Sequence, residues 1–117
     1  MTIDISALDA YREVMGEEAD TFIADVIDTY LNSAVGLIST LHNSLSANDA
    51  KTFERTAHTL KSTSATVGAM TLSTLAAELE KLSKSDPLPG LASRLGPVGE
   101  EFVKAEAELK TIREKLG

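Results

Sequence analysis

The sequence predicts an all-α protein, an antiparallel up-and-down four-helix bundle with an additional short N-terminal helix. Three observations predict this class. The 117 residues are rich in alanine, leucine, glutamate, lysine and serine and include only 7 glycines and 3 prolines, a composition that favours helices. β-branched residues never alternate with polar ones over the length of a strand. Short turns between long helical patterns place successive helices antiparallel to each other.

The first helix is predicted to begin at Ser6, which can cap it, and to end near Met15, because Gly16 suits the left-handed position that often closes a helix. Acids at positions 17, 18 and 20 then favour a new start, since acidic side chains stabilise the first turn of a helix. Beyond them, apolar residues recur every three or four positions and predict one long helix with a single buried face. These residues are Phe22, Ile23, Val26, Ile27, Tyr30, Ala34, Leu37, Ile38, Leu41 and Leu45.

Two further helices are predicted in the middle of the chain. The third follows a turn and cap at residues 46–48 and stops at Gly68. In the fourth, Thr71 is the predicted cap, between the flanking apolar residues Met70 and Leu75. The spacing of the third helix predicts a buried face made of Phe53, Ala57, Leu60, Ser64 and Val67.

The segment Ser83–Gly90 is the clearest loop because it holds two of the three prolines among small polar residues. The last helix is expected after it, with Gly96 and Pro97 inside the pattern, a pair that predicts a kink or a restart. Its apolar positions are Leu91, Leu95, Val98, Phe102, Ala105, Leu109, Ile112 and Leu116.

Composition and charge exclude several classes of protein. The length suits one domain over residues 1–117 and no second core. No apolar run approaches the roughly 20 residues of a membrane span, and the first residues do not resemble an export signal, so we expect a cytoplasmic protein with no membrane insertion. The absence of cysteine removes disulfides, thiol nucleophiles and iron–sulfur clusters. A net charge of −7 and few aromatic residues argue against nucleic-acid binding.

His58 is the residue whose position most clearly indicates chemistry. At 100° per residue, the buried face of the third helix leaves His58, Lys61, Ser62 and Ala65 on a neighbouring face that is expected to be wet. A neutral imidazole is a nucleophile near pH 7 and can hold a phosphoryl group. Lys61 would attract the phosphate, and the small side chains would leave room for a partner. No metal, base or nucleotide site is evident, so the partner would supply the remaining catalytic groups.

The segment from His58 to Ala69, HTLKSTSATVGA, resembles the signature of histidine-containing phosphotransfer (HPt) domains of multistep two-component phosphorelays. That signature is His-x-Leu-Lys-Gly-Ser followed by Gly-Ala. The resemblance implies an all-helical bundle in which His58 is phosphorylated, Lys61 neutralises the phosphate and Gly68 ends the helix. It also implies a monomeric phosphocarrier, not an enzyme, without a cofactor or an ATP site. Its partners would be a hybrid sensor histidine kinase and response-regulator receiver domains, with Mg²⁺ in the receiver.

The sequence departs from that signature at Ser62, where the family usually has glycine. The Ser62 hydroxyl could donate to a phosphoryl oxygen, or the side chain could crowd the docking partner. Family members often place a polar residue of the next helix against the other ring nitrogen of the histidine. Glu80, and less readily Glu78, would take this place here and fix the tautomer.

Other interpretations stay open at this point. The leading one is a phosphorelay intermediate that accepts a phosphoryl group from one receiver aspartate and passes it to another. Alternatives are a helical adaptor that binds a signalling partner without phosphotransfer, for which Ser62 is a hint, and a sensor-kinase hairpin, which needs an acid where Thr59 stands. His58 could also be an ordinary surface histidine. His42 is interpreted as structural, and the acids at positions 17, 18 and 20 as partners of the helix dipole and not as metal ligands.

The charges are unevenly distributed along the chain. Residues 1–50 carry a net charge of −8, residues 51–84 carry +2, and residues 85–117 carry −1. The predicted His58 helix and its neighbour are therefore locally positive. Such a patch suits the acidic, Mg²⁺-binding cleft that the resemblance implies for a receiver domain, and would steer the encounter in a salt-dependent way.

Overall fold

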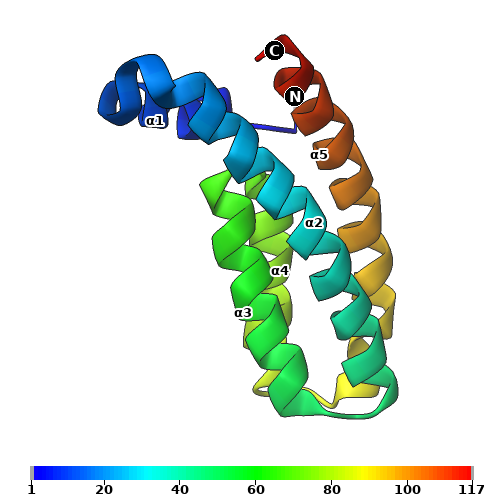
Figure 1. The fold of residues 1–117 in the computed structure, drawn as a ribbon. Coiled ribbons are helices and arrows are strands. Elements are labelled where there is room, and N and C mark those ends of the chain that lie inside the picture. The colour runs from blue at the N-terminus through cyan, green and yellow to red at the C-terminus, as the bar shows by residue number, and fades with distance from the viewer. Residues whose placement is uncertain (1, 117) are drawn as a thin grey trace.

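Residues 2–116 are described by a computed structural model, and in this part of the chain every regular element is a helix. Four helices form an antiparallel bundle, and the N-terminal helix crosses one end of it and projects sideways (Figure 1). This arrangement confirms the predicted four-helix bundle with an additional N-terminal helix. In the described part, no helix is both long and apolar enough to cross a membrane. The elements are α1 (Ile5–Met15), η1 (Gly16–Glu18), α2 (Ala19–Ser46), α3 (Ala50–Thr66), α4 (Met70–Ser83), η2 (Leu88–Arg94) and α5 (Leu95–Lys115).

The bundle core consists of the faces that the apolar spacing predicts. All five residues of the predicted inner face of α3 and its C-cap are buried, and Ser64 is the polar one among them. The Ser64 hydroxyl is 2.8 Å from the Tyr30 hydroxyl of α2, so each buried hydroxyl has a hydrogen-bond partner. Burying each large aliphatic side chain of this core contributes about 1.5–3 kcal/mol relative to exposure. The packing of this face turns the opposite face of α3 toward solvent.

Two predicted caps are wrong. Asp4, not Ser6, caps α1, because its Oδ1 accepts a hydrogen bond from the Ser6 backbone N–H at 3.0 Å and the helix already starts at Ile5. Thr71 does not cap α4, because the chain re-enters a helix directly after Ala69 and Thr71 lies within the first turn. Met70 is accordingly exposed and does not act as a staple.

The start of α3 follows the predicted turn by one residue. Asn48 adopts a positive φ of 55° in that turn. Asp49 then forms the cap, since its carboxylate accepts hydrogen bonds from the Thr52 backbone N–H at 3.2 Å and from Thr52 Oγ1 at 2.7 Å. A cap immediately before Ala50 fixes where α3 starts and therefore which residues face outward.

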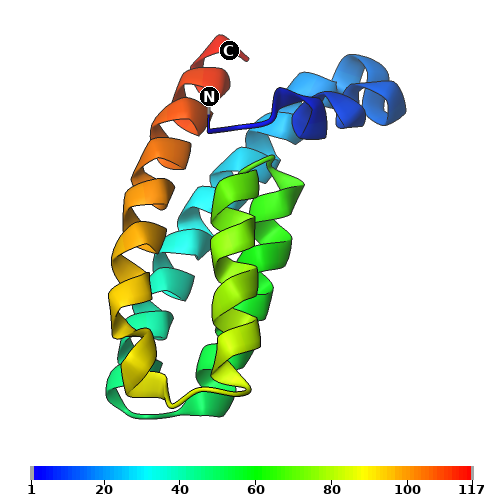
Figure 2. The same ribbon diagram turned by 180° about the vertical axis from the view of Figure 1, so that it is seen from behind.

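Gly68 makes the turn between α3 and α4, as predicted. Its φ is +83°, and a Cβ there would collide with the backbone carbonyl of Asp4. The segment before α1 lies over this turn: the Asp4 N–H donates to the Gly68 carbonyl at 2.8 Å. Figure 2 shows the same segment beside α5. It is tied to this helix because the N–H groups of Thr2 and Ile3 donate to the Glu108 carboxylate at 2.7 and 3.1 Å. Glycine is thus required for both its conformation and the close approach of another segment.

The predicted restart near Gly96 and Pro97 is confirmed. Residues 84–87 form an irregular connection, and the 3-10 helix η2 follows with Leu88 and Leu91 buried. The α-helix α5 begins only at Leu95, so Pro97 lies in its first turn, where a missing backbone N–H costs no hydrogen bond. The chain reverses direction at this connection, so α4 and α5 are antiparallel (Figure 1).

Candidate functional site

His58 lies on the outward face of α3, as the spacing predicts. Its side chain is 57% exposed, whereas Ala57 and Leu60 on either side of it are completely buried. After the short turn at Gly68, α4 runs antiparallel beside α3 (Figure 1). A side chain of α4 can therefore reach the flank of this outward face, as Glu80 does. The site is therefore a histidine on an accessible helix face, supported from one side by the next helix.

Glu80 of α4 joins the two residues that define the site. Its Oε2 is 2.7 Å from His58 Nδ1, and its Oε1 accepts a hydrogen bond from Lys61 Nζ, also at 2.7 Å. The Glu80 side chain is only 15% exposed, so both contacts are partly shielded from water. Glu78, the other candidate, instead pairs with Arg94 at 3.6 Å. Of the two acids considered, Glu80 is the one that contacts the histidine.

The Glu80 contact determines which ring nitrogen of His58 is available. The hydrogen bond from Lys61 lowers the pKa of Glu80, partial burial opposes this shift, and the hydrogen bond from His58 lowers the pKa further. An ionised carboxylate can only accept hydrogen bonds, so Nδ1 carries the proton in this contact. In the neutral ring, Nε2 then keeps an unprotonated lone pair.

Ser62 and Lys61 are both positioned by hydrogen bonds around the α3 backbone. The Ser62 hydroxyl donates to the His58 carbonyl at 3.2 Å, one turn back along the helix. The Ser73 hydroxyl of α4 donates to the Lys61 carbonyl at 2.8 Å, which ties the two helices together beside the site. The Ser62 side chain is thus turned toward the backbone of its own helix and does not project over the outward face around His58.

A shallow concavity of about 290 Å³ lies beside the His58 ring and is lined by Lys51, Glu54, Arg55, His58 and Glu80. Neither Lys51 nor Arg55 is among the site residues predicted from the sequence. The signal was nevertheless present, because they precede His58 by seven and three residues, and helical side chains lean toward the N-terminal end of their helix. The ring is therefore bordered by residues that come before it, in addition to Lys61, which comes after it.

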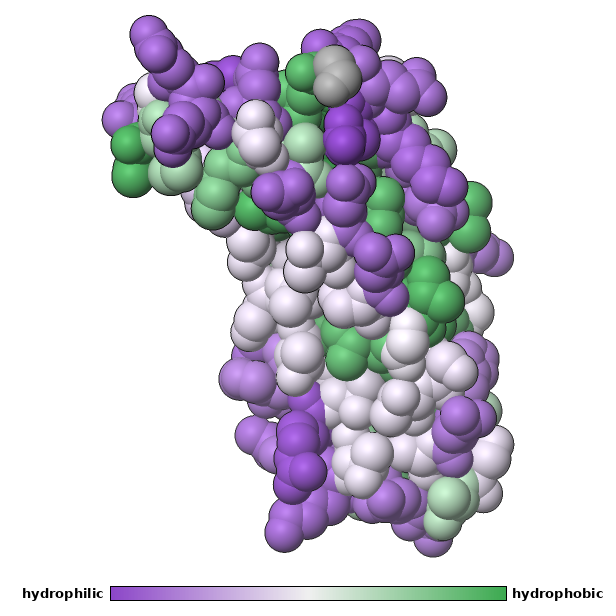
Figure 3. Space-filling model, in the orientation of Figure 1, coloured by the Kyte–Doolittle hydropathy of each residue, from purple (hydrophilic) through white to green (hydrophobic). Residues whose placement is uncertain are grey.

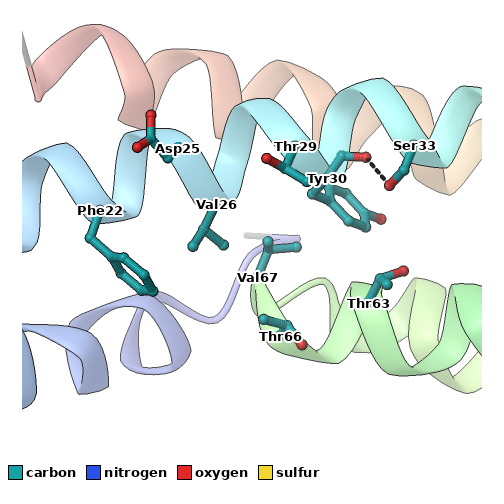
Figure 4. A pocket seen from close by; sticks show the side chains of 9 residues that line it. All are labelled: Phe22, Asp25, Val26, Thr29, Tyr30, Ser33, Thr63, Thr66 and Val67. Atoms are coloured by element: carbon teal, nitrogen blue, oxygen red, sulfur yellow. Dashed lines mark hydrogen bonds between the residues drawn. The ribbon is translucent and has the colours of Figure 1, made fainter.

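A second, more apolar groove of about 340 Å³ lies between α2 and α3, on the other side of α3 from α4. Val26 of α2 and Val67, which follows α3, extend toward one another across it (Figure 4). Its only charged lining residue is Asp25. The remaining lining residues are Phe22, Thr29, Tyr30, Ser33, Thr63 and Thr66.

Other candidate residues lie elsewhere. His42 is exposed on α2 beside the buried Leu41, and its interpretation as a structural residue stays a prediction. Among residues 2–116, no three His, Cys, Asp or Glu side chains gather closely enough to hold a metal ion. Gly68 lies in the turn between α3 and α4, beyond the site, and affects the site only by allowing α4 to pack beside α3.

Comparisons with known proteins agree with the class that this fold and site define. The protein-family model of the Hpt domain matches residues 25–115, well over half of the chain. The chain therefore belongs to the Hpt domain family and has a histidine phosphotransfer role in phosphorelays.

The chain is similar to two solved structures. The crystal structure of histidine-containing phosphotransfer protein B (HptB) from Pseudomonas aeruginosa PAO1 aligns with a TM-score of 0.85 and 26% identity, covering 97% of this chain and 96% of that one. The HPT domain of a sensor hybrid histidine kinase from Shewanella aligns with a TM-score of 0.74 and 21% identity, covering 96% and 97%. No curated protein matches the chain by sequence. The structural matches confirm the helical fold over nearly its whole length.

Proposed function

We propose that His58 is the phosphoryl acceptor of this Hpt domain, and that it takes the group from a receiver aspartate and passes it to another receiver. The contact between Glu80 and His58 Nδ1 at 2.7 Å is the observation that carries this proposal. It leaves Nε2 unprotonated on a ring that is more than half exposed. An accessible nitrogen lone pair is the requirement for accepting phosphoryl groups from a second protein.

The transfer step balances with the groups on this chain and one partner aspartate. The Nε2 lone pair forms a bond to phosphorus, while the bond between phosphorus and the aspartate oxygen breaks and its electron pair returns to the carboxylate. Because Nδ1 keeps its proton, the ring gains a positive charge, which the Glu80 carboxylate stabilises. Onward transfer reverses these steps with a second aspartate.

Lys61 and Ser62 support this step in different ways. Lys61 places a positive charge next to the ring while its Nζ stays bound to Glu80, which favours the approach of a phosphoryl group. Ser62 contributes by its small size, because its hydroxyl is directed to the His58 carbonyl and not over the ring. The receiver would provide Mg²⁺ and the remaining catalytic groups, so this chain acts as a carrier without its own cofactor.

The receiver domain would dock over the exposed face of α3 and reach the groove between α2 and α3. A pale surface of intermediate hydropathy covers much of this face between more hydrophilic regions at the two ends of the molecule (Figure 3). Uncharged side chains with an apolar groove at their centre favour protein contact, since little desolvation of charge is needed. We place this encounter in the cytoplasm, with one copy of this chain in each complex.

Labelling by a phosphorylated receiver domain tests the proposal. We expect an acid-labile phosphate on the parent protein and on His42→Gln, and none on His58→Gln. His42→Gln is the matched control because it removes the other histidine, which is also exposed. Equal labelling of His58→Gln and the parent would reject His58 as the acceptor. Stable binding of receivers without any labelling of the parent would instead identify an adaptor.

A further inference from the structure

The concavity beside His58 contains more positive charge than the HPt signature accounts for. Its cations are Lys51 and Arg55, on the first half of α3. They lie on the same exposed side of the helix as His58, since positions 51, 55 and 58 are separated by four and three residues. The ring leans toward them because helical side chains point toward the N-terminal end. These two side chains therefore border the space next to the histidine.

The acids near this space already have other hydrogen-bond or ion-pair partners. Glu80 binds Lys61 at 2.7 Å, and Glu54 pairs with Lys84 of α4 at 3.6 Å. The Asp49 carboxylate accepts hydrogen bonds from Thr52 in the helix cap, and Arg55 attracts it only through longer-range electrostatics.

Lys51 and Arg55 differ from these cations. Among residues 2–116, no carboxylate lies within salt-bridge distance of either side chain. Both residues are exposed, and strongly hydrophilic side chains are visible along this part of α3 (Figure 3). The concavity thus holds two cations whose charge is not balanced by a direct partner.

We propose that Arg55, assisted by Lys51, binds the phosphoryl group during its transfer to His58 and while it stays on the ring. The inference rests on the proposed function. Lys61 has its Nζ bound to Glu80, so direct contacts to phosphoryl oxygens fall to the cations of the concavity. The planar guanidinium of Arg55 offers paired N–H donors that match phosphoryl oxygens, and Lys51 adds a more mobile point charge. Arg55 is therefore a phosphoryl-binding residue upstream of the HPt signature.

The same cations could instead contact acidic residues of the receiver domain. A small-molecule phosphoryl donor distinguishes this role from binding of the phosphoryl group. Phosphoramidate transfers its phosphoryl group directly to imidazole: the bond from phosphorus to Nε2 forms, the original P–N bond breaks, and ammonia leaves. No receiver takes part in this reaction. A cation that binds the phosphoryl group affects the rate with phosphoramidate, whereas a cation that only contacts the receiver does not.

The variants are Arg55→Gln, Lys51→Gln and the double substitution, with Lys104→Gln as the matched control. Lys104 is an exposed lysine on α5, so its substitution changes the net charge as much as each single substitution does. With phosphoramidate we expect phosphorylation of His58 to slow about threefold for each single variant and about tenfold for the double variant, as partly screened charge pairs do. Arg55→Lys should recover part of the rate. The ³¹P resonance of the phosphorylated protein should shift in Arg55→Gln and in the double variant, and should stay unchanged in Lys104→Gln.

Three outcomes overturn the inference or its basis. Phosphoramidate rates equal to that of Lys104→Gln, combined with slower transfer from a receiver, would assign the cations to partner contact and reject a phosphoryl site. Variants of Arg55 and Lys51 that react as fast as Lys104→Gln with both phosphoramidate and the receiver would also reject a phosphoryl site. Labelling that does not depend on His58 would instead overturn the proposed function itself, which the His58→Gln control detects separately.

Discussion

The side of α3 that faces α4 is charged, and the side that faces α2 is not. On the α4 side, His58, Lys61 and Glu80 form a chain of two short polar contacts. On the α2 side, hydroxyl and apolar residues line a groove with one carboxylate, Asp25. Under the proposed function, one flank of the helix carries the reactive groups and the other offers a surface for protein contact, so phosphoryl chemistry and docking should respond to different substitutions.

Both flanks depend on the turn at Gly68, so Gly68→Ala should have the largest effect. The added Cβ would collide with the Asp4 carbonyl, and alanine is strained at a φ of +83°. We expect the free energy of unfolding, measured in urea, to fall by about 1–3 kcal/mol or more. Gly36→Ala is the control, because a Cβ there meets no atom within 4 Å and the helix should gain up to about 1 kcal/mol. Unchanged stability of Gly68→Ala would contradict the close packing over the turn.

Removing Glu80 tests the charged flank. Glu80→Ala deletes the acceptor of both His58 Nδ1 and Lys61 Nζ, so the tautomer is no longer fixed and the charge that forms on the ring is not stabilised. We expect transfer from a phosphorylated receiver to slow by at least about tenfold. The matched control is Glu78→Ala, on the same helix but paired with Arg94, which should transfer at the parent rate. Similar losses in both variants would point to a general charge effect.

Phe22→Ala tests the uncharged flank. Phe22 lines the groove between α2 and α3, and loss of an aromatic contact in a protein interface typically costs about 1 kcal/mol. We therefore expect the Kd for a receiver domain to rise roughly fivefold, with an unchanged phosphorylation rate with phosphoramidate. Val103→Ala, an exposed apolar residue of α5, serves as control. A slower phosphoramidate reaction in Phe22→Ala would mean that the two flanks are not independent.

The smallest expected effect concerns stability in acid. The pKa of Glu80 in the folded protein lies below its ordinary value of 4.5, chiefly because of the hydrogen bond from Lys61. A lowered folded pKa stabilises the fold above the unfolded pKa, and this contribution is lost as the pH falls through the folded pKa. The stability difference between the parent and Glu80→Gln should thus be largest near neutral pH and shrink below about pH 4.5. A difference that stays constant into acid would contradict an ionised Glu80.

Much of the fold could be predicted from the sequence because the buried faces have a regular period. The inner face of α3, from Phe53 to Val67, follows this rule and is buried. The cap of α1 could not be predicted as reliably, since Asp4 and Ser6 are both good caps and only the backbone path decides between them. The contact of Asp4 with Gly68 is likewise invisible, because it joins segments far apart in sequence.

The candidate site also has residues that the sequence predicts and contacts that it does not. His58 and Lys61 stand out in the sequence by their spacing, and the pairing with Glu80 was expected only from the family resemblance. Arg55 does not stand out in the sequence, because a charge on an exposed helix face usually has no function. Its relation to His58 depends on the direction in which helical side chains lean. Geometry was therefore needed to distinguish a solvated cation from one that borders the reactive ring.

The most direct test of the account is to locate the phosphorus–nitrogen bond. Protein labelled with ¹⁵N in its histidines would be phosphorylated by a receiver domain and studied by ¹⁵N and ³¹P NMR. The Glu80 contact predicts a protonated Nδ1 on His58 before the reaction and a phosphorus coupling at Nε2 of the same ring after it. Phosphorus bound at Nδ1 of His58, or at His42, would contradict the account.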